Sequence, residues 1–309
     1  MHSMVRMRRL AMLALWLAGG ICAHGQQNPG LTVEPSGRSL AEPDAAPVEK
    51  PLDLRRAEPE PVSLEPTLEE EAFFGPAMRG EAWAQTKLGK LYVTASGDPR
   101  RLEQGVDLLR KAAEQNDAEA IYLLATMTAA GAGMEQSNVE AFEQMKRAAD
   151  LGFTDAQFAL GTMCFEGRGT TKNETAAVNW LQKAATGGKK EAMFSAGRIM
   201  LARPDPEMRA EGLALVNRAI ENGHIQATLM LATAYGRGSM GMPKDEAKAE
   251  ALLKPAAERG DADCQVTLAS LYKFGDSFAA RRDEAQAWLQ RAADHGHPKA
   301  LEILQSEER

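Results

Sequence analysis

The sequence predicts an all-α protein, a right-handed α-solenoid of about six helix-turn-helix repeats that ends in a capping helix. Three registers of small residues recur together at a period near 36, and each copy carries two segments of helical periodicity. No copy shows the alternating pattern of a β-strand. Only neighbouring copies can cover the apolar face of a helix pair, so residues 77–309 are expected to stack as a solenoid.

The registers are defined by small side chains at fixed places in each copy. The first lies four residues before a Leu-Gly-like pair: Ala84, Ala120, Ala156, Ala192, Ala227, Cys264 and Ala300, spaced by 36, 36, 36, 35, 37 and 36 residues. The second is a pair: Ala112-Ala113, Ala148-Ala149, Ala184-Ala185, Ala219-Ile220, Ala256-Ala257 and Ala292-Ala293. The third follows three residues after each pair: Asn116, Gly152, Gly188, Gly223, Gly260 and Gly296. Small residues at crossing points allow helices to approach to about 8–10 Å.

The third copy shows both helices of a repeat. Residues 154–167 place apolar side chains at 156, 160, 163 and 164, and residues 173–188 place them at 177, 180, 181, 184 and 185. Both spacings are close to 3.6 residues. Asn173 is the expected N-cap of the second helix, and Gly187 and Gly188 are expected to end it. Residues 297–309 begin a seventh first helix and then turn polar, which predicts the capping helix.

The third copy resembles the Sel-1-like repeat, a relative of the tetratricopeptide repeat. Its matching residues are Ala156, Leu160-Gly161, the Gly167-x-Gly169 turn, Trp180, and Ala184-Ala185 with Gly188. The fifth and sixth copies match in the same way, and the resemblance covers residues 82–304. The fourth copy departs most, because Arg203, Pro204 and Pro206 stand where the glycine turn belongs, and the first copy has Ala95 in that place.

The resemblance implies binding rather than chemistry. Members of this family are similar to other helical-pair solenoids, in which the first helices line a concave face that binds proteins, and exported bacterial members have envelope or host-facing roles. No cofactor is implied. The cysteine-rich branch carries a disulfide in each repeat, which this chain lacks.

Residues 1–25 are predicted to be a signal peptide, because Arg6, Arg8 and Arg9 precede an apolar run at 10–21 and Ala23–Gly25 offers a small-x-small cleavage site. The run is too short to span a bilayer comfortably. A retained membrane anchor and a lipid anchor at Cys22 are the alternatives, and Ile21 before the cysteine disfavours the second. The protein is therefore expected to be periplasmic or secreted, and to meet a membrane only if the signal is retained.

Residues 26–76 are predicted to form a disordered Pro/Glu-rich linker. They contain nine prolines and 11 acidic against four basic residues, so they bury too little apolar surface to fold. A cleavable pro-segment is the alternative.

A column of aromatic residues is the candidate binding site. Two residues after the first register the copies read Thr86, Tyr122, Phe158, Phe194, Leu229 and Val266. The family geometry implies that this column lies at or near the concave face, with the three aromatics as adjacent rungs. The flanking polar rim would contain Trp83, Lys90, Glu119, Thr126, Asp155, Thr162, Glu191 and Arg198. Such a surface suits a peptide, but the same rings could instead fill gaps between first helices.

Candidate catalytic and phosphate-binding motifs are weak. The stretch GRGTTK at 167–172 lacks the spacing and the preceding strand of a phosphate loop, so it is expected to be a turn in register with Gly131, Gly238 and Gly275. Ser270-x-x-Lys273 matches the S-x-x-K motif of serine acyl-enzymes without its companion motifs. His295 and His297 have no third metal ligand nearby in the sequence, and Cys164 and Cys264 are expected to be buried free thiols.

These observations favour a non-enzymatic scaffold or adaptor in the cell envelope or medium, which binds a peptide or protein in its concave groove. The candidate partner-binding residues are Trp83, Tyr122, Thr126, Phe158, Thr162, Phe194 and Arg198. A formal charge of −7 disfavours nucleic acid as a partner, and no small-molecule cofactor is expected. A hydrolase of cell-wall or β-lactam substrates that uses Ser270 is the alternative, with a structural or chaperone-like role as the remainder.

Overall fold

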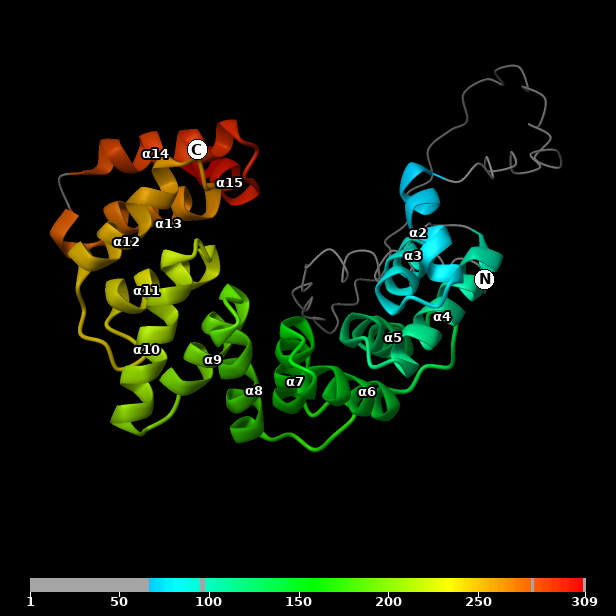
Figure 1. Cartoon of the computed structure of the whole chain (residues 1–309). Helices are drawn as coiled ribbons and strands as arrows, with labels where there is room; N and C mark the ends of the chain where they lie inside the picture. The colour runs from blue at the N-terminus through cyan, green and yellow to red at the C-terminus, as the bar shows by residue number, and fades with distance from the viewer. Residues whose placement is uncertain (1–66, 95–97, 279–280, 308–309) are drawn as a thin grey trace, which may run out of the picture.

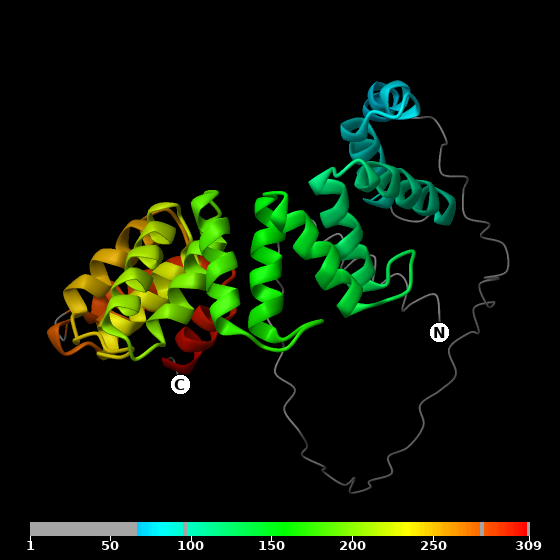
Figure 2. The same cartoon turned by 60° about the horizontal axis from the view of Figure 1, so that its bottom comes forward.

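The computed structural model describes residues 67–94, 98–278 and 281–307, which form an all-α repeat solenoid (Figure 1). Successive helix pairs stack along the chain in sequence order and trace an arc, as the turned view in Figure 2 also shows. The fold class is therefore confirmed. The predicted signal peptide at 1–25, the linker up to residue 66 and Ala95 lie outside the described residues.

The helices alternate between first and second members of each pair. The first helices are α3 (Ala82–Thr94), α5 (Ala118–Ala130), α7 (Thr154–Glu166), α9 (Lys190–Leu201), α11 (Ile225–Arg237), α13 (Ala262–Phe274) and the capping helix α15 (Pro298–Glu307). The second helices are α4 (Pro99–Glu114), α6 (Asn138–Asp150), α8 (Glu174–Thr186), α10 (Pro206–Glu221), α12 (Glu246–Glu258) and α14 (Arg282–Asp294). A further helix, α2 (Leu68–Met78), precedes α3, and a short 3-10 helix covers Asp276–Phe278. Helices α5, α7, α9 and α11 lie on the inner side of the arc in Figure 1.

The small-residue registers lie at helix crossings and at the turns between repeats, as their spacing predicts. The Ala84, Ala120, Ala156, Ala192, Ala227, Cys264 and Ala300 side chains have no exposed surface, so each lies at a helix crossing. The six residues of the third register all have positive φ, between 63° and 98°, which lets the chain turn from a second helix into the next first helix. Asn116 is the non-glycine member, and asparagine tolerates the left-handed region better than most residues.

Several glycines inside the helices are required by close approach. A Cβ on Gly197 would lie 2.6 Å from the Gly212 carbonyl oxygen, and one on Gly161 would lie 2.7 Å from the Leu181 side chain. Side chains at these points would push the paired helices apart. The core is correspondingly rich in alanine and leucine, and it runs along the length of the solenoid. Cys164 and Cys264 lie in this core as free thiols, as predicted.

The predicted turns are confirmed in part. Gly131, Gly167 and Gly238 end their helices in the left-handed conformation, and Asn173 caps α8 by accepting a hydrogen bond from the Ala176 N–H at 2.9 Å. Gly275 was expected to do the same and does not: its φ is −74°. The chain leaves α13 extended there because the N–H groups of the next two residues turn toward the carboxylate of Glu246.

The boundary of the linker at residue 76 was wrong, because helix α2 covers Leu68–Met78. Thr67 and Glu70 form a capping box in which each side chain accepts a hydrogen bond from the other residue's backbone N–H. Ala77 is buried against α3. The helix therefore serves as the second helix of a partial repeat that precedes the first complete copy.

The fourth copy differs from the others where its sequence predicts that it should. Helix α9 ends at Ala202 in the right-handed conformation, without a left-handed glycine. Asp205 then caps α10 by accepting a hydrogen bond from the Met208 N–H at 2.8 Å, and Pro206 occupies the first turn. A proline-initiated helix thus replaces the glycine turn.

Candidate functional site

The aromatic column lies in the seams between repeats rather than on the open surface. Phe158 is 9% exposed, while Tyr122 and Phe194 are half-buried. Of the other members of the column, Thr86 and Val266 are buried and Leu229 is half-buried. The column therefore contributes mainly to packing, which was the alternative that the sequence left open.

Each aromatic of the column contacts the residue that starts the next first helix. The ring centroids of Tyr122 and Phe153 are 5.1 Å apart, and those of Phe194 and His224 are 4.6 Å apart. The Lys189 Nζ lies 5.3 Å from the centroid of Phe158. Phe153, Lys189 and His224 are the N-cap residues of α7, α9 and α11. The rings thus join one repeat to the next through the N-cap position.

Acidic residues one place before the first register form a second column. Asp155 Oδ1 pairs with the Lys189 Nζ at 2.6 Å, and Asp263 Oδ1 lies 3.0 Å from the His297 Nε2. Glu191 occupies the same place before His224. Burial lowers the pKa of His224, and the charge of Glu191 opposes that shift. Asp155 and Asp263 thus each pair with a basic residue that precedes the first helix of the following repeat.

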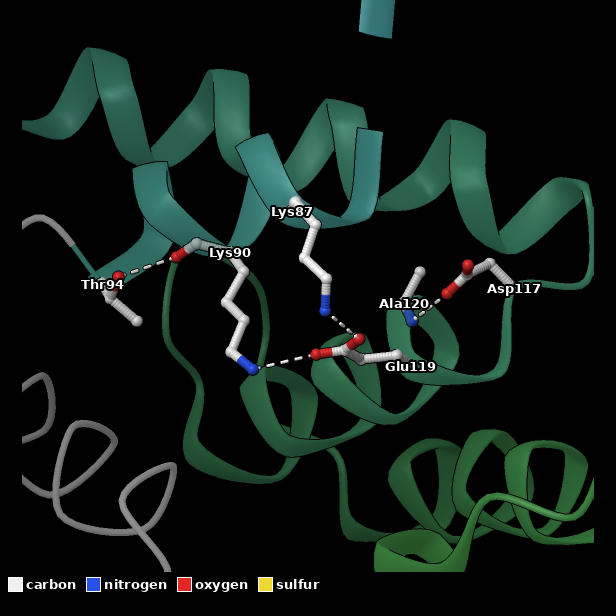
Figure 3. Close-up of polar contacts among 6 residues, drawn as sticks. All are labelled: Lys87, Lys90, Thr94, Asp117, Glu119 and Ala120. Carbon is white, nitrogen blue, oxygen red and sulfur yellow. Dashed lines mark hydrogen bonds and ion pairs between the residues drawn. The ribbon is translucent and has the colours of Figure 1, made fainter. Parts of the chain in front are cut away.

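At the N-terminal end the same place holds Glu119, which two lysines of α3 clasp (Figure 3). Its carboxylate accepts hydrogen bonds from the Lys87 Nζ at 2.8 Å and the Lys90 Nζ at 2.9 Å. Burial acts to raise the pKa of Glu119, but these two hydrogen bonds hold it below its usual value. The cluster fixes α3 against α5 and leaves the lysine side chains almost half exposed.

The candidate residues differ in how accessible they are. Trp83 is 51% exposed, with its indole N–H donating to Glu81 Oε2 at 3.0 Å, and Arg198 is exposed beside the Phe165 ring. Thr162 is half-buried and donates to the Phe158 carbonyl at 3.1 Å. Thr126 is buried and donates to the Leu123 carbonyl at 2.7 Å. Trp83 and Arg198 are therefore the candidates that a partner can reach without disturbing the repeat seams.

A pocket of about 230 Å³ between α11 and α13 was missed by the sequence reasoning. Its lining includes Thr233, Arg237, Thr267, Ser270 and Phe274. Thr233 and Ser270 occupy the same place in their copies as Lys90, Thr126, Thr162 and Arg198, so the repeat register itself could have pointed to them.

Ser270 lies in this pocket, but its hydroxyl donates to the Val266 carbonyl one helical turn earlier, at 2.9 Å. The pocket lining contains no histidine, and Lys273 is not part of it. In the described residues no group of three His, Cys, Asp or Glu side chains could hold a metal ion. The lining offers hydroxyl oxygens, the Glu246 carboxylate and two cations, Arg237 and Lys244, and the Ser270 hydroxyl is bonded to the backbone of its own helix.

The GRGTTK stretch is a turn whose cations are held by glutamates. Arg168 Nη2 pairs with Glu166 Oε2 at 3.0 Å, and Lys172 Nζ pairs with Glu174 Oε1 at 3.2 Å while it lies over the Phe165 ring. Gly167 and Gly169 both have positive φ. Among the described residues no strand leads into it, so the element that a phosphate loop requires is missing there.

Glu246 lines the pocket and anchors the chain after α13. Its carboxylate accepts hydrogen bonds from the N–H groups of Ser277 at 2.8 Å and Asp276 at 3.0 Å, and Lys244 Nζ lies 2.9 Å away. The Ser277 N–H is the largest cause that lowers the pKa of Glu246, to about 2. Because the folded state holds the ionised form, this carboxylate stabilises the fold above the unfolded-state pKa near 4.5.

Glu246→Gln is therefore expected to lower the free energy of unfolding by about 2 kcal/mol at pH 7, since charge-assisted hydrogen bonds are lost. The difference from the parent protein should shrink as the pH falls from about 4.5 toward 2, where the parent carboxylate becomes protonated and loses its advantage. Urea unfolding at a series of pH values measures both effects. A difference that stays constant across this range would contradict the assignment.

No helix among the described residues has the length and apolar character needed to cross a bilayer.

Comparison with known proteins identifies the repeats. The profile of the Sel1 repeat matches residues 84–117, 118–153, 154–189, 225–261 and 262–297. The fourth copy, with its proline-initiated helix, falls in the gap between the third and fourth matched segments. No curated protein matches the chain.

Two solved structures share the architecture. A protective antigen of uropathogenic Escherichia coli with the same repeat fold superposes with a TM-score of 0.61 at 25% identity, over 75% of this chain and 50% of that protein. A Sel1 repeat protein from Oxalobacter formigenes gives a TM-score of 0.56 at 27% identity, over 76% of this chain and 68% of that protein. The chain thus spans half of the length of the Escherichia coli protein. Proteins built from Sel1 repeats generally act as non-enzymatic scaffolds for protein interactions, and this chain belongs to the Sel1 repeat family.

Proposed function

We propose that this protein is an exported, non-enzymatic scaffold that binds a peptide or protein across the face formed by its first helices. This inner face is defined by the accessible side chains Trp83, Lys87, Lys90, Arg198, Arg237 and Phe274. The observation that carries the proposal is that this face combines exposed aromatic rings with cations that are only partly neutralised. The interfaces between repeats are already packed, so these side chains remain available to a partner. Aromatic and arginine side chains are the residue types enriched at protein interfaces.

The basic and apolar residues at 1–25 support export to the periplasm or the medium. The acidic Pro-rich segment that follows would then carry the solenoid away from its point of attachment or exit. A partner that meets the inner face would be held mainly by ring stacking at Trp83 and by ion pairs at Arg198.

The proposal is tested by affinity capture from an envelope extract with the full chain as bait. Trp83→Ala combined with Arg198→Ala is expected to reduce the recovery of specific partners at least about tenfold, since it removes an aromatic and an arginine anchor. Val139→Ala combined with Arg218→Ala is the matched control, because both side chains are exposed on the second helices α6 and α10. Equal recovery with the two double variants would exclude Trp83 and Arg198 as the anchors of the binding surface.

The hydrolase alternative is favoured only by the place of Ser270 in the α11–α13 pocket. Covalent labelling of the purified full chain by a penicillin probe, lost in Ser270→Ala, would establish that activity. Capture of a partner without such labelling supports the scaffold.

A further inference from the structure

Gly236 is a helical glycine that the packing of the fold does not require. It lies in the last turn of α11, one residue before the helix ends at Arg237, and glycine is a poorer helix former than alanine. A Cβ added there would meet Leu271 Cδ1 at 3.4 Å and Ala249 Cβ at 3.8 Å, which are ordinary contacts. By contrast, a Cβ on Gly89, Gly161 or Gly197 would come closer than 3.0 Å to a neighbouring helix. The same place in the other copies holds Val93, Ala129, Phe165, Leu201 and Lys273.

The missing side chain leaves the pocket between α11 and α13. The part below Gly236 is apolar, with Ala232, Ala249, Leu253 and Leu271 in the lining. Its volume of about 230 Å³ is below the range of about 300–1,000 Å³ that is usual for small-molecule sites. The pocket therefore suits one branched side chain of a larger ligand better than a cofactor.

Hydroxyl groups at the mouth can receive a peptide backbone. Thr267 and Ser270 each donate their own hydrogen to a carbonyl one turn earlier, at 2.8 Å and 2.9 Å. Their oxygens therefore keep acceptor capacity for an N–H group that approaches from outside. Phe274, which is 74% exposed at the end of α13, provides an apolar surface beside the same opening.

The charge at the mouth favours an acidic group. Lys244 is already paired with Glu246 at 2.9 Å and with Asp276 at 2.6 Å. No hydrogen bond or ion pair joins the exposed Arg237 side chain to another of the described residues. Its guanidinium can thus form a bidentate pair with a carboxylate that arrives with the ligand.

We propose that this pocket binds an extended peptide segment that presents a branched apolar side chain, with an acidic residue one or two positions away. The apolar side chain occupies the space above Leu253 and Leu271, and the carboxylate pairs with Arg237. The inference rests on the proposed scaffold function and gives it a specific site and ligand chemistry. The site is separate from Trp83 and Arg198, so the two can fail independently.

The test uses the full chain as the target of a displayed library of random 12-residue peptides. Enrichment of Leu, Ile or Val within two positions of Asp or Glu is expected. Enriched peptides that lack this pairing, or no enrichment above background, would overturn the proposal. The peptide most strongly enriched is then titrated against pocket variants.

Gly236→Leu, which fills the pocket, is expected to lower the affinity for that peptide at least about tenfold. Gly236→Ala should lower this affinity less. The same variant should have a higher melting temperature than the parent protein, since alanine is the better helix former and fits without a clash. A purely structural glycine would give a destabilised protein instead. Binding that is unchanged in Gly236→Leu would place the peptide elsewhere and overturn the site.

Arg237→Gln should lower the affinity for the acidic peptide about fivefold or more. The same substitution should not change the affinity for a peptide in which Gln replaces the acidic residue. The difference between the two effects is the energy of the ion pair. Arg218→Gln on α10 is the matched control and is expected to change nothing. If these effects are absent but Trp83 and Arg198 still govern capture from extracts, the pocket proposal fails and the scaffold function stands.

Discussion

Phe158→Ala is expected to lower the free energy of unfolding by about 3 kcal/mol, because it empties a buried seam between two repeats. The Phe158 side chain is 9% exposed and packs in the core cluster that also contains Leu181 and Met193. The substitution also removes the ring under the Lys189 ammonium. In a solenoid each repeat is stabilised by its neighbours, so this loss weakens the interface between the third and fourth copies. Urea unfolding followed by circular dichroism measures the change.

Trp83→Ala is the control for this prediction. It removes an even larger aromatic side chain from the N-terminal first helix, but Trp83 is 51% exposed and lies outside the core clusters. We expect a loss of no more than about 1 kcal/mol, most of it from the edge contact with Phe73. Comparable losses for Phe158→Ala and Trp83→Ala would mean that the aromatic column is surface rather than seam.

The period of the sequence was sufficient to predict the solenoid, because the repeat is set by local physical requirements. Ala156 and its equivalents are needed wherever two helices cross, and Gly152 and its equivalents are needed wherever a second helix turns into the next first helix. These requirements return in every copy. Capping follows the same logic, as the hydrogen bond from the Ala176 N–H to Asn173 shows.

The start of the solenoid was predicted wrongly because the composition and the repeat register indicate different structures there. Ala77 and Gly80 stand 36 residues before Ala113 and Asn116, so the register extends into α2. The prolines and glutamates around them indicated a disordered linker instead. The Thr67–Glu70 capping box was the local signal for a helix start.

The candidate site was harder to predict because exposure depends on residues one repeat away. Phe158 is covered by the start of α9, and Tyr122 is covered by Phe153 at the start of α7. A column of similar residues does not reveal whether the following N-cap residue covers it. The α11–α13 pocket depends on the absence of a side chain at Gly236, which is apparent only once the neighbouring helices are in place.

Gly169→Ala is expected to be as disruptive as the loss of Phe158, at about 3 kcal/mol, although it adds only a methyl group. Gly169 has a φ of +72°, which L residues rarely adopt, and a Cβ there would overlap the Asn138 carbonyl oxygen at the start of α6. Backbone cannot move aside as a flexible side chain can, so the turn between α7 and α8 or the first turn of α6 must shift.

Gly152→Ala separates the two causes. Gly152 has a φ of +89° with no atom within 4 Å of an added Cβ, so alanine there carries the backbone strain alone, about 1 kcal/mol. The excess measured for Gly169→Ala over Gly152→Ala in chemical unfolding is therefore the effect of the contact with α6. If the two variants lose equal stability, the GRGTTK turn does not pack against the preceding repeat. A clear excess would establish that Gly169 is required by the contact of this turn with the preceding repeat.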